Sequence, residues 1–159
     1  MSASEALTTL IGLRCWYVSS GGAVGPSFSL AIGKRIPREF KLQNSAHEEV
    51  FREYEGESSI YVWSTWRLDA ATGPICSSDN PIDLITSSLN QLRGEFVAAF
   101  NLSSPVGDLT LRFSNGLTLH IFCDHVGDDA TFQGNWEFVN GTEIIAVGTS
   151  GVAEVSKRT

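Results

Sequence analysis

The segment that most constrains the fold is residues 108–124, DLTLRFSNGLTLHIFCD, where apolar and polar residues alternate on both sides of Ser-Asn-Gly. A two-residue turn at Asn115 and Gly116 would place the two apolar sets on opposite faces of the sheet. A three-residue loop, with Gly116 left-handed in a bulge, places them on one face. The segment therefore predicts an antiparallel hairpin with one buried face. The expected pairs are Phe113 with Leu117, Leu111 with Leu119, and Leu109 with Ile121.

The opposite face of this hairpin carries mostly polar side chains. Alternate residues of a strand point to the same side of a sheet. We expect this face to be open to solvent or to a partner, with Arg112 and His120 as candidate binding residues. The full set on this face is Thr110, Arg112, Thr118, His120 and Phe122.

Residues 59–68, SIYVWSTWRL, predict one central strand because β-branched and aromatic residues dominate the run. Its aliphatic residues lie on one face, and Tyr61 and Trp63 lie on the other. Aromatic side chains outside a core are enriched at recognition hot spots, which makes Tyr61 and Trp63 candidates for a binding surface. The alternative is that helices cover this second face, as is common for central strands.

Other runs of alternating residues predict a first hairpin across a glycine-rich loop and a last hairpin across Asn140 and Gly141. The glycine loop leads into a strand, so it lacks the helix N-terminus that phosphate-binding loops use. These further strands cover residues 14–19, 27–33, 94–102, 135–139 and 142–147.

Two helices are predicted from capping signals. Ser45 and Glu48 form a Ser-x-x-Glu capping box for a short first helix that Gly56 would stop. Asn80 can cap the second helix, with Pro81 in its first position. The buried stripe expected for the second helix is Ile82, Ile85, Leu89 and Leu92.

This order of elements predicts an α+β fold in which two helices pack on an antiparallel or mixed sheet of about six to eight strands. The 159 residues contain no repeat or linker, so we expect one domain over 1–159 with loose ends at about 1–10 and 150–159. We find no signal peptide and no long apolar segment, which predicts a cytoplasmic protein. The three cysteines are then expected to be buried thiols.

A net charge of −7 disfavours nucleic acid and anionic membranes as partners, because both are bound largely through Lys and Arg. A basic partner would be attracted. The alternative is that modest acidity serves only solubility. Oligomeric state does not follow from the sequence.

Residues of the types that bind metals or act in catalysis gather near the end of the hairpin. However, His120 and Cys123 are an odd number of positions apart on a strand and point to opposite faces. Pairing of Cys123 with His125 for catalysis has no third group to orient it. We therefore predict no metal, no cofactor and no catalytic residue. The acidic residues Asp124, Asp128, Asp129 and Glu137 are instead candidates for contacting a basic partner.

The segments YVWSTWRL, DLTLRFSNGLTLHIFCD and NWEF, in this order around a proline-capped helix, resemble small bacterial proteins that include immunity proteins of polymorphic toxin systems. The resemblance covers roughly residues 10 to 140 and implies a protein that binds and blocks a cognate toxin.

Three functional hypotheses follow. The first is a non-enzymatic binding protein, with an immunity protein that blocks a basic toxin as its particular form. The second is a small-ligand binder or enzyme that uses the face around Arg112 and His120. The third is a structural subunit that self-associates through Trp63.

Overall fold

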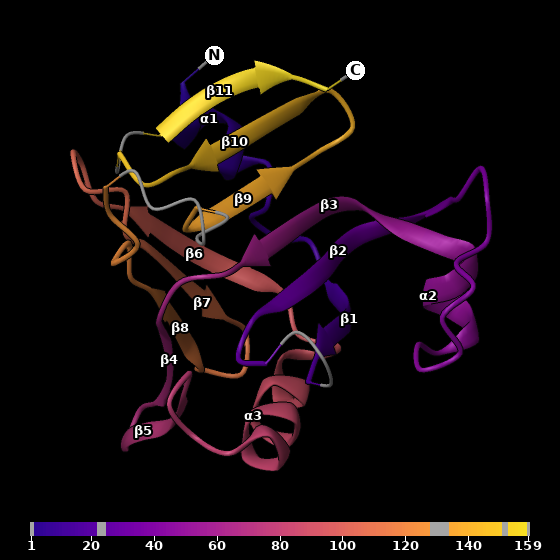
Figure 1. Cartoon of the computed structure of the whole chain (residues 1–159), viewed down its shortest axis with the longest axis horizontal. Coiled ribbons are helices and arrows are strands. Elements are labelled where there is room, and N and C mark those ends of the chain that lie inside the picture. Colours follow the sequence, from indigo (N-terminus) through magenta and orange to yellow (C-terminus); the bar gives the residue numbers. More distant parts are fainter. Residues whose placement is uncertain (1, 22–24, 128–133, 151–152, 159) are drawn as a thin grey trace.

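The computed structural model describes residues 2–21, 25–127, 134–150 and 153–158. Within these residues the chain forms eleven strands in two antiparallel sheets, together with three short α-helices (Figure 1). The six-stranded sheet has the spatial order β1 (Cys15–Ser20), β2 (Phe28–Pro37), β3 (Tyr54–Val62), β9 (Trp136–Val139), β10 (Glu143–Val147) and β11 (Ala153–Lys157). The five-stranded sheet has the order β5 (Gly73–Ser77), β4 (Trp66–Ala70), β8 (Thr118–Ile121), β7 (Leu109–Phe113) and β6 (Val97–Leu102).

One apolar core receives alternate residues from both sheets. The two sheets meet at β1 and β6, where Arg14 and Phe96 form an isolated bridge. The largest fully buried side chains are aromatic, and each buried indole N–H in the core needs an acceptor. Trp66 Nε1 donates to the Pro26 carbonyl, and Trp136 Nε1 donates to the Gly107 carbonyl, both at 2.8 Å.

The predicted register of the 108–124 hairpin is confirmed. Leu109 pairs with Ile121 and Leu111 with Leu119. The Phe113 N–H donates to the Leu117 carbonyl at 2.9 Å, and Gly116 has a φ of 85°, as the three-residue loop requires. The hairpin across Asn140 and Gly141 is confirmed as well, with Val139 opposite Ile144.

The predicted antiparallel pairing is confirmed, but the α+β class with one sheet of about six to eight strands is not, because the described chain is mostly β, with two antiparallel sheets of six and five strands and three short α-helices. Residues 59–68 are not a single strand, because β3 ends at Val62 and β4 begins at Trp66 in the other sheet. The inward and outward alternation continues across this corner, so the pattern does not reveal it. Trp63 N and Ser64 N both donate to the Asn135 carbonyl, at 2.9 and 3.2 Å, and hold the corner.

Residues 3–8 and 153–157, which lie in the segments expected to be loose, form regular structure. Helix α1 (Ala3–Thr8) begins with a capping box formed by Ser2 and Glu5, and it buries Ala6 and Leu7. Strand β11 pairs along its whole length with β10.

The two predicted helices begin at other residues, and with other caps, than the sequence indicated. The Ser45 capping box is wrong: α2 (Glu49–Glu53) starts after Glu48 without a side-chain cap. Gly56 does not stop this helix, since it already lies within β3. In α3 (Ile82–Leu89) Pro81 is the N-cap, and Asn80 instead accepts from the Ser77 N–H at 2.8 Å. Of the predicted stripe, Ile85, Leu89 and Leu92 are buried, whereas Ile82 is 38% exposed.

The long hairpin of β2 and β3 extends from the body and carries α2 at its far end (Figure 1). A register shift between Cys15 and Tyr17 turns both Trp16 and Tyr17 to the outer face of the sheet. Together with Ala31 they form a second, small core. The residues packed against it from around α2 are Val50, Phe51 and Tyr54.

The three cysteines are free thiols, and Cys15 and Cys76 are buried as predicted. Cys123 is half-buried. Burial raises the pKa of both Cys15 and Cys123 to about 12, so neither is a ready nucleophile near neutral pH. Among the described helices, none has the length and apolar character needed to span a bilayer.

The shared core predicts a sharp contrast between neighbours on β8. Leu119 is fully buried between the sheets, and Thr118 points outward. Leu119→Ala should lower the free energy of unfolding by about 2–5 kcal/mol, because it removes buried apolar atoms and leaves a cavity. Thr118→Ala should change it by less than about 1 kcal/mol. Urea denaturation measures both, and equal losses would contradict the assignment of the faces.

Candidate functional site

The predicted site residues fall on two separate outer faces. Tyr61 and Glu137 lie on the outer face of the six-stranded sheet, with Trp63 just beyond the end of β3. Arg112 and His120 share the outer face of the five-stranded sheet. Asp124 lies near the corner between β3 and β4. Asp128 and Asp129 lie outside the described residues.

The side chains of Tyr61, Trp63 and Glu137 form what we call the aromatic–acid patch. The rings of Tyr61 and Trp63 are nearly parallel, with an interplanar angle of 10° and centroids 6.2 Å apart. A shallow hollow of about 220 Å³ adjoins them and is lined by Ser19, Ser27, Phe28 and Ser29. A rigid aromatic pair beside a small hollow is suited to receive a side chain of a partner.

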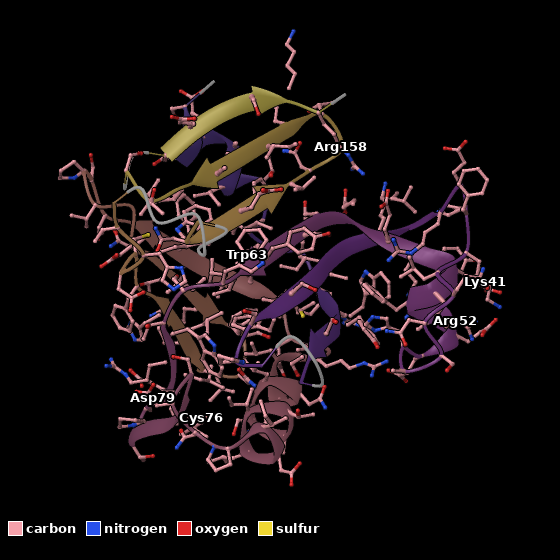
Figure 2. The ribbon with its side chains drawn as sticks, in the orientation of Figure 1. Lys41, Arg52, Trp63, Cys76, Asp79 and Arg158 are labelled. Carbon is pink, nitrogen blue, oxygen red and sulfur yellow. The ribbon has the colours of Figure 1, made fainter. Side chains whose placement is uncertain are left out.

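Helices do not cover the aromatic pair. Tyr61 is 39% exposed, and Trp63 is the one of the four tryptophans that is not buried. Figure 1 shows the three helices away from the Val62 end of β3, and Figure 2 shows Trp63 there, far from the α2 region that carries Lys41 and Arg52. The alternative that helices bury this face is therefore excluded at Tyr61 and Trp63 for the described helices, whereas α2 packs on the same face over Trp16 and Tyr17.

Glu137 stands directly opposite Tyr61 in the pairing of β3 with β9. The described residues supply no salt-bridge partner for its carboxylate. Burial raises the pKa of Glu137 above its ordinary value, because the half-buried charge loses hydration. A cation brought by a partner would relieve this cost.

Glu137→Gln should therefore stabilise the isolated protein near pH 7. Because the folded-state pKa is raised, the ionised form is disfavoured by folding, and this penalty grows as pH rises through the unfolded and then the folded pKa. We expect a higher urea midpoint than wild type at pH 7, and a difference that shrinks at about pH 3.5, where the carboxyl is protonated in both states. Glu154→Gln, at an exposed position of β11, is the matched control. A lower midpoint for Glu137→Gln at pH 7 would contradict an unpaired charge.

The face around His120 is held together by its own ion pairs. Arg67 donates to both oxygens of Asp69, at 2.7 and 3.0 Å, and His120 Nε2 lies 3.0 Å from Asp69 Oδ2. The guanidinium of Arg67 holds the pKa of Asp69 below its usual range. The Thr110 hydroxyl lies 3.5 Å from His120 Nδ1. Because these side chains pair with one another, the cluster needs no ligand to balance its charges.

Sequence reasoning missed Arg67 and Asp69, although both lie on the face that it identified. The pairing of β4 with β8, which puts Arg67 opposite His120, joins residues more than fifty positions apart. No local pattern signals such a pairing. Arg112 is exposed, and neither it nor His120 lines any of four clefts of 220 to 470 Å³ formed by described residues.

Asp124 serves the corner between the sheets. Burial alone would raise its pKa, but hydrogen bonds from the Thr65 hydroxyl and the Thr65 N–H keep it lowered. The next residue, His125, donates its N–H to the side chain of Asn135 at 2.9 Å. Asp124 is therefore engaged with its own chain. Within the described part of the chain, no three His, Cys, Asp or Glu residues are grouped to hold a metal ion.

Comparisons of the chain with models of protein families, with curated proteins and with solved structures find no match.

Proposed function

We propose that this chain is a non-catalytic cytoplasmic protein that binds a basic protein, and that it acts as an immunity protein against a basic toxin. The observation that carries the proposal is the stacked pair of exposed Tyr61 and partly buried Trp63 beside the carboxylate of Glu137, which has no salt-bridge partner among the described residues.

The aromatic pair supports protein binding. Tyr and Trp dominate interface energetics because they bury large areas while ordering few side-chain torsions. Both rings project from rigid strand or strand-end backbone, since the corner after Val62 is held by Asn135. A pre-positioned aromatic pair loses little entropy when a partner docks on it.

The charge supports a basic partner. The chain carries a net charge of −7, which favours encounter with a basic protein. Glu137 offers a carboxylate beside the rings, where an arginine or lysine of the partner would gain a cation–π contact and an ion pair. The resemblance of the strand segments to immunity proteins supports a toxin as this partner.

A second candidate function uses the other face, as a small-ligand site or an enzyme around Arg112 and His120. One observation favours it: Asp69, His120 and Thr110 form a series of carboxylate, imidazole and hydroxyl. The hydroxyl distance of 3.5 Å exceeds the roughly 2.6–3.2 Å expected for an activated nucleophile. Asp69 is also shared with Arg67. We therefore rank this function below protein binding.

The direct test is affinity capture from a lysate of the protein's own host, with low-salt and then high-salt washes. We expect a stoichiometric basic protein that is retained at low salt and released at high salt. A Tyr61→Ser/Trp63→Ser variant should capture at least about tenfold less of the basic protein, because truncation of hot-spot side chains weakens binding by at least this much. Phe40→Ser, at a position 79% exposed, is the matched control and should capture as wild type does.

The captured protein is then expressed alone and together with the chain in a bacterial host. The immunity role predicts arrested growth alone, rescue by wild type and by Phe40→Ser, and failed rescue by the double variant. A captured protein that is harmless alone would contradict immunity. Capture unaffected by the double variant would contradict the aromatic–acid patch as the binding surface. Capture of the chain itself would favour self-association instead.

A further inference from the structure

A cleft, which we call the notch, opens in the six-stranded sheet where β3 extends beyond β9. Strand β3 pairs with β2 from Tyr54 to Val62, but it pairs with β9 only over residues 59–62. Beyond Ser59 the described chain places no strand on this side of β3. The notch has a volume of about 440 Å³, within the roughly 300–1,000 Å³ typical of binding pockets. Its walls include residues 55–58 of β3, the turn 140–142 after β9, and Arg158.

The notch follows from a bulge in the hairpin of β2 and β3. Between the pairs Ile32–Ser58 and Arg35–Gly56, β2 has one residue more than β3. Gly33, in the bulge, has a φ of 86°, which favours glycine. A bulge bends its pair of strands and increases their twist, and here it carries residues 54–58 away from β9. Figure 1 shows this part of β3 leaving β9 and β10 on its way to α2.

The edge of β3 that faces the notch carries unpaired backbone groups. In an antiparallel ladder, the N–H and C=O of alternate residues point to the same neighbouring strand. Trp63, just after β3, donates its N–H to the Asn135 carbonyl, so the odd-numbered residues of β3 point towards β9. Glu57 and Glu55 continue this series, and no described strand stands opposite them. The notch therefore presents their N–H and C=O groups with the spacing of a β-ladder.

A buried hydroxyl also faces the notch. Ser58 is only 3% exposed and lines the notch, and its hydroxyl makes no hydrogen bond to another described residue. A buried hydroxyl without a partner costs free energy, which a bonding group that enters the notch would recover. The outer edge of β11 differs, because its residues 154–157 are exposed to water. The notch is thus a recessed strand edge with an unsatisfied polar group beside it.

The charges along this edge favour a basic residue opposite Glu57. Glu55 already lies near two cations, with Arg38 at 3.9 Å and Arg158 at 3.6 Å. Glu57 has no salt-bridge partner among the described residues, and its Oε1 accepts from the Lys34 N–H at 2.8 Å. Opposite charges that face each other across a ladder stabilise the pairing of the strands.

We propose that the notch binds an extended basic segment of a partner protein, which adds to β3 as an antiparallel strand in line with β9. Unpaired strand edges bind extended chains in this way, with affinity from backbone hydrogen bonds and selectivity from side chains. A Lys or Arg of the segment stands opposite Glu57, the next residue opposite Gly56, and the third opposite Glu55. The notch lies at the other end of β3 from Tyr61, so this proposal does not depend on the aromatic–acid patch.

The test is NMR titration of the isotope-labelled full-length chain with the capped peptide Ac-Lys-Val-Thr-Val-NH₂ at millimolar concentrations. We expect saturable shifts centred on the backbone amides of Glu55 and Glu57, and slower hydrogen exchange at both. N-methylation of the peptide's Thr should weaken binding at least about tenfold, because this N–H faces the Glu55 carbonyl. N-methylation of the last Val, whose N–H points away from β3, is the matched control and should change binding by less than about twofold.

Glu57→Gln tests the selectivity for a basic residue, because Gln keeps an oxygen for the Lys34 N–H but carries no charge. Wild type should bind the Lys peptide at least about threefold more tightly than Ac-Glu-Val-Thr-Val-NH₂, and Glu57→Gln should lose most of this preference. Glu154→Gln changes the net charge equally at an exposed position outside the notch lining and should keep the preference.

Three results would overturn strand addition at the notch: shifts that lie away from residues 55–57, equal weakening by the two N-methylations, or no binding in the millimolar range. An unchanged preference in Glu57→Gln would overturn the basic segment as the occupant. Protection of the Glu55 and Glu57 amides that rises with protein concentration, without peptide, would assign the notch to a second copy of the chain and overturn the partner protein.

Discussion

The passage of the chain from one sheet to the other at residues 63–65 determines the rest of the structure. It places Val62 and Trp66 in one core while they belong to different sheets. Asn135, fully buried, holds this corner: its carbonyl accepts from Trp63 and Ser64, and its side chain bonds the backbone of His125 and Gly148. A buried amide is stable only when its groups are paired, so this network ties the corner to β9 and β10.

The corner also explains why two outer faces are available. Each sheet gives its apolar side to the shared core, and the helices pack elsewhere, at the core's edge or at the end of the long hairpin. Of the two faces, the one around His120 pairs Arg67, Asp69 and His120 with one another, and only Arg112 on it is exposed without an ion pair among the described residues. In the aromatic–acid patch, the Glu137 carboxylate has no salt-bridge partner in the described part of the chain, and it lies beside two aromatic rings. This combination is the physical ground for proposing the patch as the recognition surface.

Local sequence patterns predict strand pairing only between residues that lie close along the chain. The register around Gly116 could be derived because only one loop length buries all six apolar residues. The corner could not be predicted, because inward and outward residues keep alternating from Ile60 to Leu68 as they would in a single strand. The sequence does not decide whether helices cover Tyr61 and Trp63, because this depends on where the helices pack. Contacts between distant segments, such as Arg67 with His120 or Arg93 with Glu48, follow from topology and have no local signature.

The most direct test of this account is fluorine NMR of the full chain labelled with 5-fluorotryptophan, with single Trp-to-Phe variants to assign the four resonances. We expect a clear solvent isotope shift between H₂O and D₂O for Trp63 and little for Trp66, which is fully buried three residues later. Equal shielding of Trp63 and Trp66 would contradict the open outer face and the binding surface proposed on it.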